Sequence, residues 1–218
     1  MFETELTRAL GIRCPIVLAP MAGGPGGPDL VAAVSDAGGL GTLGAGYLTP
    51  EQLRSAIREI RNRTDRPFGV NLFAPEHPAE PEDAIARMTD YLNRYRDTLG
   101  IPPSPLLPQY AESFEEQAQV LLEERVTVFS FTFGIPPANV LRTMKQRGVF
   151  VIGTATTVDE AMQLEAAGTD AIVAQGSEAG GHRGIFAQDA PDPLVGTMAL
   201  VPQIADHVSV PVIAAGGI

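Results

Sequence analysis

Two residue types are almost absent from the sequence. Cysteine and lysine each occur once in its 218 residues, as Cys14 and Lys145. A lone cysteine cannot form an internal disulfide, which excludes a disulfide scaffold and is typical of a reducing cytoplasm. No apolar run approaches the ~20 residues that cross a bilayer, and Glu3, Glu5 and Arg8 precede the first apolar run, unlike in a signal peptide. We therefore expect a soluble cytoplasmic protein without a membrane partner.

Positive charge is also scarce. The 15 Lys+Arg residues stand against 26 Asp+Glu residues, which gives a formal net charge of -11. Nucleic acids and anionic membranes are bound by clustered cations, so this balance argues against both as partners. The hydrophobic share of 44% is ordinary for a folded chain. Since there is no linker or low-complexity tract, the sequence predicts a single domain over 1–218 with a buried core.

Short apolar runs bounded by glycine or proline recur along the chain. Most are continuous rather than alternating, which is the pattern of strands buried on both faces of a parallel sheet. Seven such runs predict strands at Pro15–Met21, Leu40–Gly46, Phe68–Phe73, Thr127–Gly134, Phe150–Ala155, Ala171–Gly176 and Pro211–Gly217.

Helix signals lie between these runs. Thr49–Gln52 combines an N-cap threonine, a proline at the first helical position and a glutamine that completes a capping box. Gly38, Gly148 and Gly168 stand just before predicted strands, where a left-handed residue would end the preceding helix. The alternation of strands and helices indicates an α/β fold with a parallel sheet.

One interval between strands is much longer than the ~30 residues of a βα unit. It separates Phe68–Phe73 from Thr127–Gly134 and contains two helical patterns, Glu82–Leu99 and Ser113–Glu124, but no β-rich run. We interpret residues 74–126 as a helical insertion.

Seven alternating strands suit either a doubly wound sheet or a (β/α)8 barrel. The barrel typically takes ~250 residues, and this sequence stops on the predicted strand Pro211–Gly217. Because a natural domain rarely ends on a buried strand, we expect a (β/α)8 TIM barrel that is truncated after its seventh strand.

In such folds, ligands bind at the carboxyl ends of the strands. Glycines dominate these ends and allow a ligand to approach the backbone, while Asn71 and Gln175 add carboxamides. Lys145 falls in a predicted helix, which excludes Schiff-base and pyridoxal enzymes. No histidine or acidic pair at these ends has metal-ligand spacing, so we expect no metal, and redox chemistry would need an organic cofactor.

His182 is the candidate general base. It lies in a glycine-rich loop, Gly176–Gly184, beyond the carboxyl end of the sixth predicted strand. The alternative is a loop histidine whose hydrogen bonds are satisfied by a neighbour. Glu178 and Arg183 in the same loop are expected to order it rather than to catalyse.

The Gly216–Gly217 pair follows the last predicted strand. Barrels often build a phosphate site from the loops after their seventh and eighth strands, so this pair indicates phosphate binding. The alternative is a tight turn from strand to helix.

Together these residues resemble the nitronate monooxygenase (2-nitropropane dioxygenase) family of FMN-dependent (β/α)8 barrels. The resemblance runs through almost the whole chain, and its most specific part is the Glu-Ala-Gly-Gly-His stretch at 178–182. The other matching stretches are Cys14–Met21, Ala37–Gly41, Pro67–Asn71, Gln175–Gly184 and Val212–Ile218.

The resemblance implies a non-covalently bound FMN and an oxidoreductase that uses O2 to convert alkyl nitronates and nitroalkanes into carbonyl compounds and nitrite. It implies that His182 is the base. It also implies that the partners are a small nitro compound and O2, and it is compatible with a homo-oligomer. Met21, Phe131 and Phe133 are expected to keep the pocket apolar. The residues implied in FMN binding are Pro20, Met21, Ala22, Asn71, Gln175, Gly180 and Gly181, with Gly216 and Gly217 near the phosphate.

Three alternatives remain open. A flavin-dependent enoyl-acyl-carrier-protein reductase shares the Glu-Ala-Gly-Gly-His stretch, but its loop continues with an aliphatic residue where this chain has Arg183. A flavin-free phosphate-binding barrel would be an isomerase or lyase. Because the family continues through a strand-eight phosphate loop, a chain ending at Ile218 could also be a fragment without activity.

Overall fold

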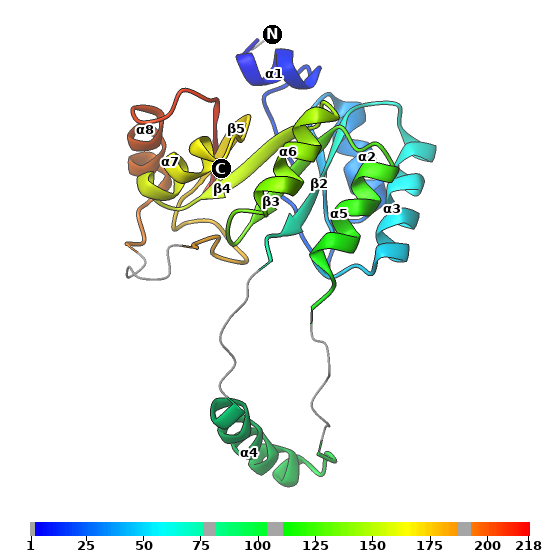
Figure 1. Ribbon diagram of the computed structural model, residues 1–218, viewed down its shortest axis with the longest axis vertical. Coiled ribbons are helices and arrows are strands. Elements are labelled where there is room, and N and C mark those ends of the chain that lie inside the picture. The colour runs from blue at the N-terminus through cyan, green and yellow to red at the C-terminus, as the bar shows by residue number, and fades with distance from the viewer. Residues whose placement is uncertain (1–2, 76–81, 104–110, 187–192) are drawn as a thin grey trace. The chain divides into compact units, whose positions relative to one another are not determined.

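A computed structural model of the chain describes residues 3–75, 82–103, 111–186 and 193–218 (Figure 1). These residues contain one parallel sheet whose strands follow one another in sequence order. The sequential order confirms the barrel and excludes the doubly wound sheet, whose strand order reverses. The strands are β1 (Gly41–Gly44), β2 (Phe68–Phe73), β3 (Val128–Thr132), β4 (Phe150–Ala155), β5 (Ala171–Gln175) and β6 (Val212–Ala215).

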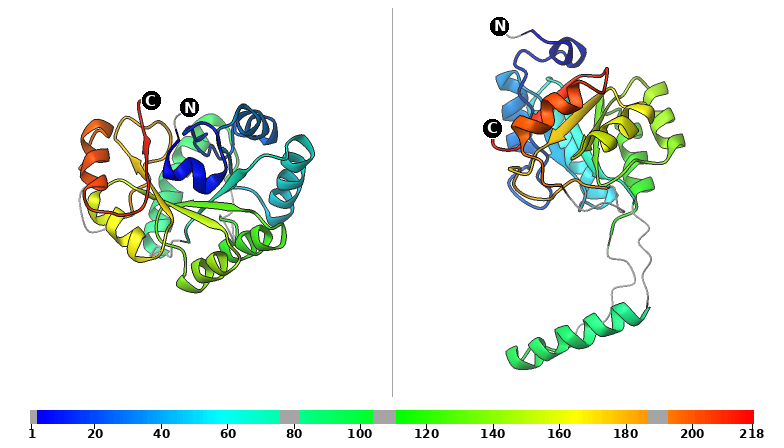
Figure 2. Two further views of the ribbon diagram at one scale, coloured as in Figure 1. Left: turned by 90° about the horizontal axis from the view of Figure 1, so that it is seen from above. Right: turned by 90° about the vertical axis from the view of Figure 1, so that its left-hand side faces the viewer.

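The helices that lie within residues 28–63 and 114–205 surround the outside of the curled sheet, which Figure 2 shows from above. Within the described part of the chain, no helix is both long and apolar enough to cross a membrane. The helices are α1 (Glu5–Leu10), α2 (Pro28–Ala37), α3 (Pro50–Arg63), α4 (Glu82–Leu99), α5 (Phe114–Glu123), α6 (Ala138–Gln146), α7 (Val158–Ala166) and α8 (Thr197–Ala205).

The prediction of a strand over Pro15–Met21 is wrong, because this segment makes a single parallel bridge next to β1. The N–H of Leu18 donates to the carbonyl of Leu40 at 2.9 Å, and the N–H of Leu40 donates to the carbonyl of Ile16 at 2.9 Å. Further along a parallel ladder, residue 20 would donate its N–H to the carbonyl of Thr42, and Pro20 has no N–H. The pairing therefore stops, and the described sheet has six strands rather than seven.

The predicted helix ends are confirmed. The Thr49 hydroxyl accepts the N–H of Gln52, and the Gln52 side chain accepts the N–H of Thr49, which completes the capping box. Gly38, Gly148 and Gly168 have φ angles of 98°, 74° and 92°, in the left-handed region that glycine adopts without strain.

The chain divides into two compact units, Met1–Pro75 with Glu112–Ile218 and Glu76–Ala111. The second unit contains α4. The first unit includes α5, which packs against α3 and β2 as an ordinary helix of the barrel. The separate unit in the structure, Glu76–Ala111, is therefore shorter than the insertion expected over residues 74–126.

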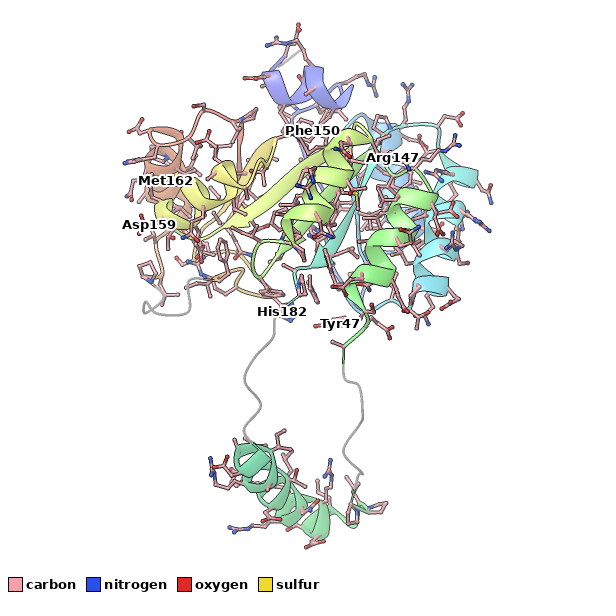
Figure 3. The ribbon with its side chains drawn as sticks, in the orientation of Figure 1. Tyr47, Arg147, Phe150, Asp159, Met162 and His182 are labelled. Carbon is pink, nitrogen blue, oxygen red and sulfur yellow. The ribbon has the colours of Figure 1, made fainter. Side chains whose placement is uncertain are left out.

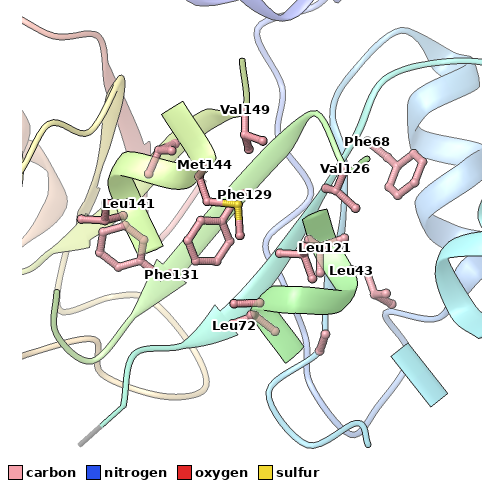
Figure 4. Close-up of a cluster of buried hydrophobic side chains, with 14 of the residues drawn as sticks. Leu43, Phe68, Leu72, Leu121, Val126, Phe129, Phe131, Leu141, Met144 and Val149 are labelled. Carbon is pink, nitrogen blue, oxygen red and sulfur yellow. The ribbon is translucent and has the colours of Figure 1, made fainter. Parts of the chain in front are cut away.

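The core of the first unit lies on both faces of the sheet. Phe129 and Phe131 of β3 are buried against Leu141 and Met144 of α6, between the sheet and its helices (Figure 4). The adjacent Val128 belongs to a second cluster on the opposite face, since neighbouring side chains of a strand point to opposite sides. That cluster joins Leu6, Leu10 and Ile12 to Leu40, Val128, Ile152 and Ala171, so α1 covers the amino ends of the strands.

Glu124, the C-cap of α5, ties this helix to α3. Its side chain is 9% exposed and accepts hydrogen bonds from Arg54 at 3.0 Å, Arg58 at 2.8 Å and Arg61 at 3.3 Å. The hydrogen bond from Arg58, followed by that from Arg54, holds the pKa of the Glu124 carboxyl below its ordinary value.

We expect Glu124→Gln to lower the free energy of unfolding by about 2 kcal/mol at pH 7, because three guanidinium groups lose a charged acceptor. Since the folded-state pKa lies below the unfolded one, the contribution is complete above the unfolded pKa and is lost as the pH falls through the folded pKa. Urea unfolding at pH 7 and at about pH 3 would measure the difference. Glu59→Gln, which removes an exposed carboxylate bonded to Arg63, is the control and should change stability by less than about 0.5 kcal/mol. Equal losses at both pH values would show that the charge of the Glu124 carboxylate is not what stabilises the fold.

Candidate functional site

The carboxyl ends of the strands carry an aromatic cluster that includes His182. Tyr47 follows β1, Phe73 ends β2, Phe133 follows β3, and His182 lies in the loop after β5. Figure 3 shows Tyr47 and His182 close together at one end of the first unit, with Arg147 at the other end. The site therefore lies opposite the end that α1 covers.

The imidazole of His182 is bordered by three rings. Its centroid lies 5.9 Å from that of Phe73 and 5.6 Å from that of Phe133, both edge-on. The Tyr47 ring lies 6.4 Å away, and its hydroxyl oxygen is 3.3 Å from Nε2 of His182. An exposed imidazole is thus bordered by three aromatic rings.

Local backbone geometry holds these rings in place. Phe133 has a φ of 71°, a conformation that bulky residues rarely adopt and that is found where the surroundings enforce it. A Cβ atom at Gly46 would lie 2.4 Å from the Phe73 ring, so glycine is required there for the ring to take its position. A Cβ atom at Gly23 would lie 3.3 Å from the Tyr47 ring.

Gln175, the last residue of β5, holds the loop that carries His182. Its amide nitrogen donates to the carbonyl of His182 at 3.0 Å, and its amide oxygen accepts the N–H of Gly184 at 2.6 Å. Its backbone carbonyl accepts a hydrogen bond from the Arg183 guanidinium at 2.6 Å. Gln175 and Arg183 therefore order the backbone on both sides of the imidazole.

Glu160 of α7 holds the far end of the same loop. Its side chain is 0% exposed. One carboxylate oxygen accepts the N–H and the hydroxyl of Thr156, each at 2.7 Å, and the other accepts the N–H of Phe186 at 2.6 Å. The loop after β5 is thus bonded to the residue that follows β4.

Glu178 binds the N-terminus of α8 rather than facing His182. Its carboxylate accepts the N–H of Thr197 at 2.8 Å and the Thr197 hydroxyl at 3.0 Å. The backbone N–H of Thr197 makes the largest contribution to holding the pKa of Glu178 below its ordinary value. These contacts agree with the ordering role expected for Glu178.

Uncharged polar side chains lie inside the curled sheet beside this cluster. Asn71 is 3% exposed, and its amide nitrogen donates to the Ser130 hydroxyl at 3.0 Å and to the Thr132 hydroxyl at 3.5 Å. A Cβ atom at Gly184 would lie 3.1 Å from the Thr132 methyl and 3.0 Å from that of Thr154. The loop of His182 therefore passes close to Thr132 and Thr154.

The remaining predicted cofactor residues flank the site. Met21 and Ala22 approach Gly44 so closely that a Cβ atom on Gly44 would lie 2.6 Å from their backbone, and the exposed Pro20 precedes them. Gly180 and Gly181 have open space where a side chain would stand.

Gly216 and Gly217 pack against the loop after β5. A Cβ atom at Gly216 would lie 2.8 Å from the Thr197 hydroxyl, and one at Gly217 would lie 3.3 Å from Cβ of Glu178. Glycine is thus required at 216 by packing within the chain itself.

The expectation that Phe131 lines the pocket is wrong, because this ring is 0% exposed and buried with Met144. Its strand position puts it on the helical face of β3, whereas Phe133 lies beyond the strand. Sequence reasoning missed Tyr47 and Phe73, although both lie at strand ends, which was the available signal. Among the residues with described positions, no group of three His, Cys, Asp or Glu side chains could hold a metal ion.

Comparison with known sequences identifies the family. Residues 3–218 match the family model described as nitronate monooxygenase. The chain is 45% identical over 219 residues to a "Probable nitronate monooxygenase" of Staphylococcus haemolyticus, covering 100% of this chain and 61% of that protein. It is 46% identical over 217 residues to a protein of the same name from Staphylococcus aureus strain MSSA476, covering 99% and 61%. The chain therefore spans about three fifths of the length of these curated relatives.

Solved structures agree with this assignment. A nitroalkane oxidase from Streptomyces ansochromogenes superposes with a TM-score of 0.87 at 39% identity, covering 99% of this chain and 61% of that one. FabK from Thermotoga maritima superposes with a TM-score of 0.74 at 35% identity, covering 100% and 55%. With the family model matching nearly every residue and the barrel shared with these structures, the chain belongs to the nitronate monooxygenase family.

Proposed function

We propose that this site oxidises alkyl nitronates and nitroalkanes with O2, forming a carbonyl compound and nitrite, with His182 as the general base. The observation that carries the proposal is the imidazole of His182 between the rings of Phe73 and Phe133, at the carboxyl ends of the barrel strands. The family membership supports the reaction class.

This arrangement suits the removal of a proton from carbon. A nitro group makes the adjacent C–H acidic, so a single imidazole can take the proton while the electron pair moves onto the nitro group. The rings of Phe73, Phe133 and Tyr47 offer an apolar surface to the alkyl part of the substrate. They would also orient the carbon that loses its proton toward the imidazole.

The polar residues fit FMN as the cofactor. Asn71, Ser130, Thr132 and Thr154 supply uncharged donors and acceptors of the kind that the edge of a flavin ring requires. Gly180 and Gly181 leave their backbone open to a ligand, as a cofactor lying against that loop would need. Bound FMN would supply the redox chemistry by accepting an electron from the nitronate.

We infer that the same residues as predicted from the sequence would hold the cofactor. The backbone of Pro20, Met21 and Ala22 borders the space next to Gly44. Asn71 and Gln175 approach the site from β2 and β5. We assign Gly216 and Gly217 to the phosphate, although the packing around Gly216 would demand glycine there without a ligand.

Asn71→Ala is expected to weaken FMN binding about tenfold, the effect of one lost buried hydrogen bond. Titrating FMN with the protein and following flavin fluorescence would measure the affinity. Gln175→Ala should weaken it as well, and should also free the loop that its amide holds. Asn139→Ala, on the exposed face of α6, is the matched control and should bind FMN normally. Unchanged affinity in both site variants would reject the cofactor assignment.

Nitrite release and O2 consumption with a nitroalkane and with its pre-formed nitronate test the activity itself. The enoyl-acyl-carrier-protein reductase alternative predicts a different result, anaerobic reduction of the bound flavin by NADH. In this chain, Arg183 stands at the position where the reductase loop has an aliphatic residue. Its guanidinium donates to the backbone carbonyl of Gln175 at the end of β5. Rapid anaerobic bleaching of the flavin by NADH without nitrite release would favour the reductase.

A further inference from the structure

The hydroxyl of Tyr47 lies 3.3 Å from Nε2 of His182. In the described part of the chain, it is the only hydrogen-bond partner of the imidazole. A neutral imidazole carries one N–H and one nitrogen lone pair, so the group bound at one nitrogen decides what the other nitrogen can do.

We propose that Tyr47 is a positioning residue for His182. Its hydroxyl oxygen accepts the Nε2 proton and so keeps the lone pair on Nδ1, the nitrogen that takes the proton from the substrate. This inference rests on the proposed function. In the step, the substrate C–H bond breaks, the proton moves to Nδ1, and the electron pair stays on the substrate as the nitronate. No oxidant takes part in this step.

The direction of the hydrogen bond follows from the chemistry of the base. If the Tyr47 hydroxyl donated to Nε2, then Nδ1 would carry the proton, and neither nitrogen would have a free lone pair. If the hydroxyl oxygen accepts instead, the same bond survives the reaction, because the imidazolium is protonated at both nitrogens. It also becomes stronger, since its donor is then charged. Tyr47 would therefore favour the product of proton transfer over the neutral state.

The structure fixes Tyr47 independently of this bond. Its ring meets Phe73 edge-on at 5.3 Å and lies against Gly23. The backbone of His182 is fixed separately by the amide of Gln175. Tyr47→Phe thus removes the hydroxyl while leaving the ring contacts that hold the cluster.

Two measurements test the proposal. Nitrogen-15 spectra of the imidazole, recorded on the chain as purified, should show the Nε2-protonated tautomer in clear excess over its share in free histidine. In Tyr47→Phe that excess should disappear. In the loaded enzyme, kcat/KM for a nitroalkane should fall about tenfold, the effect of one hydrogen bond to a charged group, while kcat/KM for the pre-formed nitronate should stay unchanged. Tyr91→Phe, which removes the hydroxyl that Tyr91 pairs with Tyr95, is the matched control and should alter neither readout.

Three results would overturn the proposal. The first is a wild-type imidazole protonated at Nδ1, and the second is an unchanged nitroalkane rate in Tyr47→Phe. The third is an equal loss with both substrates, which would show that Tyr47 only shapes the pocket. If the wild-type enzyme oxidised neither substrate, the proposed function would fail instead, and the nitrogen-15 spectra alone would decide whether Tyr47 pairs with Nε2.

Discussion

Replacing His182 with asparagine is expected to slow the oxidation of neutral nitroalkanes by about 10²–10⁴-fold, the usual contribution of a general base. A nitroalkane must lose its proton in the enzyme, and the imidazole of His182 is the base that stands beside the Phe73 and Phe133 rings. A pre-formed nitronate has already lost that proton. Its oxidation should therefore be nearly unaffected by the substitution.

Steady-state rates with both substrate forms, measured over a range of pH, test this expectation. With nitroalkane, the wild-type profile should fall at low pH, because a protonated imidazole cannot accept a proton, and this acidic limb should vanish in the variant. His207→Asn is the matched control, since His207 is exposed just after α8 and bonded to the carbonyl of Gln203. Equal losses for both substrate forms would mean that His182 positions the substrate or the flavin rather than removing a proton.

The barrel could be predicted because the apolar runs, the glycines at the helix ends and the lengths of the connections all indicated it. Continuous apolar runs marked buried parallel strands, and glycines such as Gly38 and Gly168 marked the helix ends before them. Their sequential order in the sheet then followed from the connection length, since short βα units place neighbouring strands side by side. His182 could be found in the same way, because it follows the carboxyl end of a strand in such a fold.

The contacts around His182 could not be predicted, since they depend on which face each residue takes. Phe131 and Phe133 are two residues apart, yet one packs under α6 and the other borders the imidazole, because the strand ends between them and Phe133 adopts a positive φ. The Tyr47–His182 bond joins residues 135 positions apart, which no local pattern reveals. The single bridge at Leu40 is different, because Pro20 stands in the sequence and its missing N–H is a signal against a full strand.

Glu160→Ala is expected to have the largest effect on stability, lowering the free energy of unfolding by about 3–5 kcal/mol. The substitution leaves the N–H and hydroxyl of Thr156, which is 0% exposed, and the N–H of the partly buried Phe186 without their acceptor. Because Phe186 closes the loop that carries His182, the loop should also open more often, so its amides should exchange faster with solvent. Urea unfolding and hydrogen exchange of the Phe186 amide would measure the two effects.

Glu165→Ala provides the matched control on the same helix. Its carboxylate is less deeply buried and accepts a single backbone hydrogen bond, from Ser209 at 2.6 Å, so we expect a loss of about 1 kcal/mol and unchanged exchange in the His182 loop. If Glu160→Ala does not fold, Glu160→Gln keeps the volume of the side chain and should lose about 1–3 kcal/mol, with the same increase in exchange at Phe186. A destabilised Glu160 variant with normal protection at Phe186 would show that α7 depends on this carboxylate but that the His182 loop does not.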